Sequence, residues 1–110
     1  MKIEQNSEYI FISSDENSFE DFAANFKEKH SEIKEKHVIV SISANLNIVE
    51  KDIFVFLDYA ELHQQNGTTF VLVCPRVDVD NFPETFNIVP TLQEAEDILE
   101  MENIQRDLGF

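Results

Sequence analysis

The sequence predicts an α/β fold, with a mixed sheet and with helices packed mainly on one of its faces. Short runs of β-branched and aromatic residues alternate with longer segments whose apolar residues recur at helical spacing. Residues 38–42 are almost continuously apolar, which indicates a central strand covered on both faces. The 110 residues, 43% of them hydrophobic, suit one domain over 1–110 that buries a real core.

The first half of the chain predicts two strands and a helix before the central strand. Residues 1–5 indicate an edge strand and residues 8–12 a second strand. The polar loop over 13–18 ends at Ser18, which is expected to cap a helix with Asp21 three residues later. Phe19, Phe22 and Phe26 then fall on the inward face of that helix.

The segment after the central strand predicts a second long helix. We expect it over about residues 48–65, with Asn47 as N-cap and Glu50 as the reciprocal partner in a capping box. Gly67 is suited to end it in a left-handed conformation. Residues 68–74 then indicate another buried strand.

The last part of the chain predicts a loop over 75–83, a short strand over 85–89 and a final helix. Thr91 and Glu94 form a capping-box pattern at the start of this helix. Gly109 is expected to close it, with Phe110 folding back onto the final turn. The complete order is β-β-α-β-α-β-β-α.

Charge and cysteine content exclude several classes of function. The net charge of −14 argues against nucleic acid and anionic membranes, because both require clustered Lys and Arg, and it permits a basic protein partner. The single cysteine rules out an internal disulfide and suits the reducing cytoplasm. The N-terminal residues lack a signal-peptide layout, and no apolar run has the length of a membrane span.

The loop and helix start after the central strand are the first candidate for a functional site, because sites in open α/β sheets gather at the carboxyl ends of strands. We expect six residues there to bind a partner protein: Ser43, Asn45, Asn47, Glu50, Lys51 and Asp52.

The element order and several stretches resemble the STAS domain, the fold of bacterial anti-sigma factor antagonists. The resemblance is carried by HVIVSIS, by the helix that closes at Asn66-Gly67, by TTFVLVC and by FNIVPTLQEAEDILE. It implies a non-catalytic regulatory module, monomeric or weakly dimeric. The implied partner is a protein such as an anti-sigma factor or a kinase-like regulator.

The family's phosphorylated motif, Asp-Ser-Ser-Gly, is replaced in this chain. Its position falls on Val49-Glu50-Lys51-Asp52, with Glu50 where the phosphorylated serine would stand. The resemblance therefore implies the fold and a binding role without the serine switch. Glu50 either supplies a fixed negative charge in place of a phosphate or simply completes the cap of the helix.

Other chemistry-bearing residues have simpler interpretations. Ser43 is either an alternative phosphosite or a local backbone partner at the strand end. Cys74 is expected to be a small buried hydrophobe, and His30, His37 and His63 have no metal-ligand spacing. Neither a cofactor nor a metal is expected.

Two alternative functions stay open. One is an accessory subunit of an enzyme, although no paired nucleophile and base stands out in the sequence. The other is a small-ligand-binding domain with a pocket among the Phe residues. The acidic last helix, which carries Glu94, Glu96, Asp97, Glu100, Glu102 and Asp107, is either a solvated face or a dock for a basic partner.

Overall fold

The computed structural model describes residues 1–109. Within them the chain forms a five-stranded mixed sheet with three α-helices and two 3₁₀ turns. Their order confirms the predicted α/β class and sequence of elements. The elements are β1 (Lys2–Gln5), β2 (Ile10–Ser13), α1 (Phe19–Ile33), β3 (Val38–Ser41), η1 (Ala44–Leu46), α2 (Glu50–Asn66), β4 (Phe70–Val73), η2 (Val79–Asn81), β5 (Asn87–Val89) and α3 (Leu92–Asp107).

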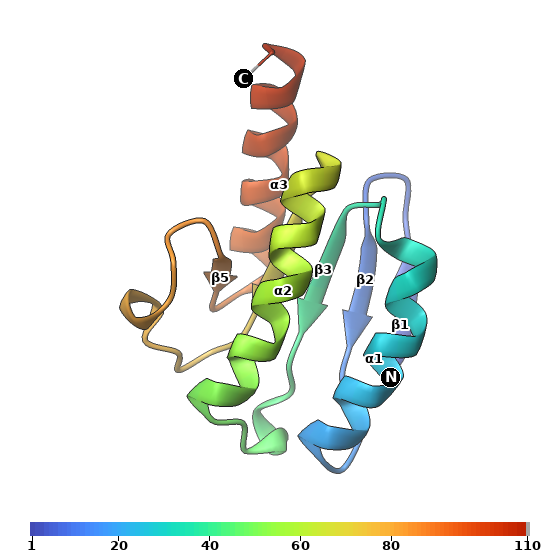
Figure 1. Ribbon diagram of the computed structural model, residues 1–110, viewed down its shortest axis with the longest axis vertical. Coiled ribbons are helices and arrows are strands. Elements are labelled where there is room, and N and C mark those ends of the chain that lie inside the picture. The colour runs from blue at the N-terminus through green and yellow to red at the C-terminus, as the bar shows by residue number, and fades with distance from the viewer. Residues whose placement is uncertain (110) are drawn as a thin grey trace.

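The strands lie side by side in the order in which they occur along the chain. β1 is antiparallel to β2, and β2 to β5 are all parallel. β3 is the central strand, and its Ile39 lies between Phe11 of β2 and Val71 of β4. The parallel strands therefore end at one edge of the sheet, where the starts of α1 and α2 also lie (Figure 1).

The helices divide between the two faces of the sheet. α1 and α2 cover one face, and the Phe rings of this layer pack edge to face, with 5.5 Å between the centroids of Phe26 and Phe56. α3 covers part of the opposite face, where Ala95 and Leu99 pack against Ile39 and Val71. Helices thus lie on both faces, two on one and one on the other.

Local capping signals in the sequence are mostly confirmed. The Ser18 hydroxyl oxygen accepts a hydrogen bond from the Asp21 amide at 3.2 Å, and the Thr91 hydroxyl oxygen accepts one from the Glu94 amide at 3.2 Å. Gly67 ends α2 with a φ of 74°. The expectation for Phe110 lies outside the described residues. Among residues 1–109 no helix combines the length and apolar character needed to cross a bilayer.

The predicted start of α2 is wrong. The helix begins at Glu50 and its N-cap is Val49, whose amide donates to the Asp52 carboxylate at 3.0 Å. Asn47 instead ends the η1 turn in a left-handed conformation. The buried Leu46 holds this extra turn against the core, so the chain enters the helix later than the local pattern indicated.

Candidate functional site

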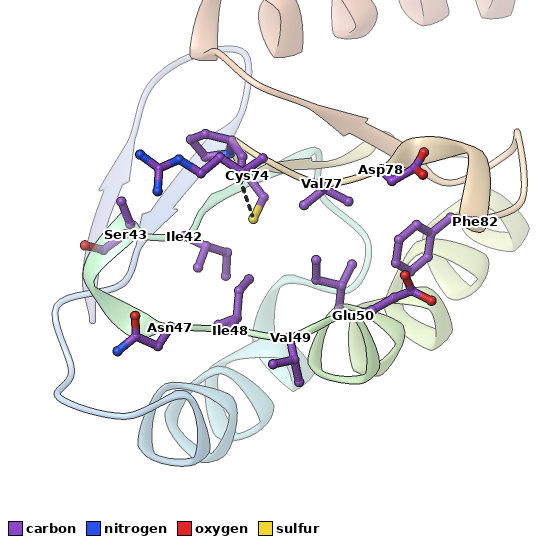
Figure 2. Close-up of a pocket in the computed structure, with 14 residues that line it drawn as sticks. Ile42, Ser43, Asn47, Ile48, Val49, Glu50, Cys74, Val77, Asp78 and Phe82 are labelled. Carbon is purple, nitrogen blue, oxygen red and sulfur yellow. Dashed lines mark hydrogen bonds between the residues drawn. The ribbon is translucent and has the colours of Figure 1, made fainter.

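A cleft of about 410 Å³ opens beyond the carboxyl ends of β3 and β4. This is the end of the strands at which the sequence predicted a functional site. The Cys74 sulfur and the Ile48 side chain point into it from opposite walls (Figure 2). Most of the residues that line it are apolar: Ile42, Ala44, Ile48, Val49, Ile53, Cys74, Pro75, Val77 and Phe82. The polar residues that line it are Ser43, Asn47, Glu50, Arg76 and Asp78.

Three of the six predicted partner-binding residues line this cleft, namely Ser43, Asn47 and Glu50. Asn45 and Lys51 are exposed beside it. Asp52 is half-buried because its carboxylate caps α2. The structure therefore brings together the middle of the predicted segment and adds a second wall, residues 74–78 and Phe82, which the sequence analysis did not assign to the site.

Glu50 does not complete the cap of α2, as one of the two interpretations held, because Asp52 has that role. The Glu50 carboxylate instead accepts a hydrogen bond from the Asn81 side chain at 2.9 Å. This bond joins the first turn of α2 to η2 beside the cleft, which Glu50 lines. Glu50 is also exposed at a helix N-terminus, where the helix dipole favours a negative charge.

Ser43 makes local contacts of the kind expected at a strand end. Its hydroxyl oxygen accepts a hydrogen bond from the Asn45 amide at 3.2 Å. Its own amide donates to the Ser14 hydroxyl oxygen at 2.7 Å. The loops after β2 and β3 are therefore tied together, which holds this wall of the cleft in place.

Backbone strain is concentrated at the cleft. Asn47 and Arg76 are the non-glycine residues with positive φ among residues 1–109, at 47° and 70°, and both line the cleft. Asparagine adopts this conformation easily, whereas for arginine it costs about 1 kcal/mol or more. Such strain persists where surrounding contacts impose it, and it is common in ligand clamps and active sites.

The cleft has limited means for covalent chemistry. Cys74 is its strongest nucleophile in principle, but burial raises the pKa of this thiol. Its hydrogen bond is a weak one, from the sulfur to the Pro75 carbonyl oxygen at 3.8 Å. Within residues 1–109 no three His, Cys, Asp or Glu side chains are grouped so that they could hold a metal ion.

Comparison with known proteins does not place the chain in a family. No protein-family model matches the chain, and no curated protein is significantly similar to it. The chemistry of the cleft itself therefore has to indicate what the chain does.

The structure also brings together two histidines for which the sequence predicted no shared site. The Nε2 atoms of His30 on α1 and His63 on α2 are 2.7 Å apart, and both rings are buried. His63 Nδ1 lies 2.7 Å from the Thr68 hydroxyl oxygen. A signal for this pair was present, because His30 and His63 continue the inward apolar spacing set by Phe26 and Ala60.

Burial and mutual contact keep this histidine pair neutral. Burial, together with the nearby positive charge of Lys34, lowers the pKa of His30. Burial, followed by the like charge of His30, lowers the pKa of His63 from 6.5 to about 4. The pair lies in the core between α1 and α2, away from the cleft, so it supports the fold and not the site.

Proposed function

We propose that this chain is a non-catalytic, cytoplasmic protein-interaction module that binds a partner protein through the cleft after β3 and β4. The observation that carries the proposal is the meeting of Ser43, Asn47 and Glu50 around one apolar cleft. Pockets that fix a partner are commonly apolar, with a few polar groups that set orientation.

The rim of the cleft has the composition of a protein-binding surface. Val49 is 52% exposed and Phe54 is 41% exposed, and the Phe54 ring packs at a tilt against Phe82, with 4.6 Å between centroids. Apolar side chains on the surface are commonplace singly, but a group beside a cleft favours contact with another molecule. We therefore expect the partner to insert an apolar side chain here.

The charge of the site favours a basic partner. Glu50 and Asp78 line the cleft, and among residues 1–109 Arg76 is the one Lys or Arg that lines it. With a net charge of −14, the whole chain attracts a cationic surface and repels an acidic one. A cationic group next to the partner's apolar anchor would lie beside the Glu50 carboxylate.

The resemblance to STAS domains supports the same end of the same helix as the binding site. In this interpretation the fold is STAS-like, and the partner is an anti-sigma factor or a kinase-like regulator. Glu50 would then supply a permanent negative charge where relatives of that kind carry a phosphorylated serine. A permanent charge would make binding constitutive, because no kinase could switch it.

The test is a charge reversal in the cleft, with a matched control on the exposed side of α2 and a second charge reversal on α3. The wild-type chain is used to capture its partner from the host cell, the partner is identified by mass spectrometry, and the purified pair is titrated by calorimetry. Glu50→Lys is expected to lose at least about tenfold in affinity, because it places a cation against a basic partner. It should cost only about 1 kcal/mol in stability, so circular dichroism should be unchanged.

The neutral control is Glu61→Lys, an equal charge change at an exposed position of α2 that does not line the cleft. It should bind the captured partner as the wild type does, apart from a small long-range effect of charge. Glu100→Lys, at an exposed position of α3, tests that helix as the alternative site. If Glu50→Lys keeps full affinity while Glu100→Lys loses it, the partner docks on α3 and the cleft is not the site.

The dimensions of the cleft also favour a second candidate, a small-ligand-binding domain. Small-molecule pockets usually have volumes of about 300–1,000 Å³, and this cleft falls within that range. A screen of small apolar carboxylic acids and amines by ligand-observed NMR would test it. A specific binder that shifts the backbone amide signals of the residues lining the cleft would favour this candidate over a protein partner.

A further inference from the structure

In the second half of α3 the apolar side chains are exposed and polar side chains face the sheet, the reverse of the first half. In the first half Ala95 and Leu99 are buried against the sheet. After Leu99 the apolar residues lie on the outer side, where Met101 and Ile104 are each 53% exposed and Leu108 is 67% exposed. These three positions are spaced three and four residues apart, so they form one stripe along the helix.

The inner side of this half is held by polar contacts instead. Arg106 donates from Nη2 to the Thr69 hydroxyl oxygen at 2.9 Å, and that hydroxyl donates to the Glu102 carboxylate at 2.7 Å. Glu102 also accepts a hydrogen bond from the Asn87 side chain at 2.9 Å. The end of the helix is thus fixed to β4 and β5 without using its apolar residues, and its last turns rise beyond the sheet (Figure 1).

An acidic groove of about 700 Å³ runs beside the apolar stripe. Ile104 belongs to both, so the two surfaces are continuous. Five carboxylates line the groove, from Glu8, Glu96, Asp97, Glu100 and Asp107. Arg106, the only Lys or Arg in α3, is engaged by Thr69 and Glu102 on the inner side. The outer surface therefore combines apolar contact with uncompensated negative charge.

We propose that the outer face of α3, formed by Met101, Ile104, Leu108 and the adjoining groove, docks a basic amphipathic helix of a partner protein. An apolar stripe on such a helix would pack against Ile104 and its neighbours, while flanking Lys or Arg side chains would meet the carboxylates of the groove. A second copy of this chain is the wrong occupant, because pairing two such faces would bring like charges together. An anionic membrane is repelled for the same reason.

This surface is distinct from the cleft of the proposed function. Its groove includes Ser7, Glu8 and His37, which lie at the amino ends of β2 and β3, whereas the cleft lies at the carboxyl ends of β3 and β4. The two surfaces therefore lie at opposite ends of the parallel strands. One chain could hold two partners at once, as an adaptor does.

The test uses the full chain and a synthetic peptide of about four helical turns, with a leucine stripe flanked by lysines. We expect the peptide to shift the backbone amide signals of α3 residues 97–108 in two-dimensional NMR. Ile104→Asn should weaken binding by about tenfold or more, since it removes the centre of the contact. Val55→Asn is the matched control, because Val55 is 44% exposed on α2, and it should bind as the wild type does.

A peptide with glutamate in place of lysine provides the charge control and should not bind. The proposal is overturned if the lysine peptide does not bind, if both peptides bind equally, or if Ile104→Asn binds as well as wild type. Signals that shift around the cleft instead of α3 would also overturn it. Sedimentation showing a dimer that Ile104→Asn dissolves would replace the proposed partner with a second copy of the chain.

Discussion

Acidification should destabilise this protein through the buried pair of His30 and His63. The two rings are in direct contact at 2.7 Å, and Phe26, Tyr59 and Phe70 surround them. A proton on either ring would place a charge in this aromatic layer, and protons on both would place two like charges in contact. The unfolded chain has no such penalty, so protons favour unfolding.

The size of the effect follows from the pKa of His63. Burial lowers it from 6.5 to about 4, so the unfolded chain binds more protons than the folded chain between these values. The contribution is fully present above pH 6.5 and is lost as the pH falls. At pH 4 the loss from His63 alone reaches about 3 kcal/mol, because one pKa unit corresponds to about 1.4 kcal/mol. The lowered pKa of His30 adds to it in the same direction.

The assay is urea unfolding by circular dichroism from pH 7.5 to pH 4, for the wild type and for the double variant His30→Leu/His63→Leu. The double variant removes both partners, so neither ring is left with an unpaired buried nitrogen. Thr68 keeps the main-chain carbonyl of residue 63 as its acceptor, at 3.3 Å. Both proteins contain the same carboxylates, so the effect of their titration cancels in the difference between the two free energies of unfolding.

We expect this difference to move by about 3 kcal/mol in favour of the double variant between neutral pH and pH 4. Parallel loss of stability in the two proteins would refute the reasoning, because it would show that the histidines titrate freely in the folded state. Imidazole carbon shifts in NMR give an independent check. They should show His63 neutral at pH 5.5.

Three further predictions concern the core, the strained loop and the thiol. Phe56→Ala should lower the free energy of urea unfolding by about 3–5 kcal/mol, since Phe56 is fully buried, whereas Phe54→Ala at an exposed position should cost far less. Arg76→Gly should raise the free energy of unfolding by about 0.5 kcal/mol. Glycine relieves the strain of the positive φ, and this gain exceeds the cost of its larger conformational entropy in the unfolded chain. Cys74 should react with thiol reagents quickly only after denaturation, since burial raises its pKa; equal rates in native and denatured protein would contradict this.

Local patterns in the sequence determined the elements of the fold. The apolar run over 38–42 encoded the central strand, and the spacing of Phe19, Phe22 and Phe26 encoded the buried face of α1. Ser18, Gly67 and Thr91 marked helix ends because a cap depends on residues only three or four positions away. Such signals can be recognised from the sequence alone, since the interacting groups are neighbours along the chain.

Tertiary structure alone decided how distant residues meet. His30 and His63 are 33 positions apart, and Glu50 and Asn81 are 31 apart. No local pattern encodes such contacts, because they depend on how α1, α2 and the loop after β4 pack on the sheet. The start of α2 belongs with them: burial of Leu46 favours an extra 3₁₀ turn over the cap that the sequence offered at Asn47. The second wall of the cleft and the outward stripe on α3 are defined by burial, which only the packed chain determines.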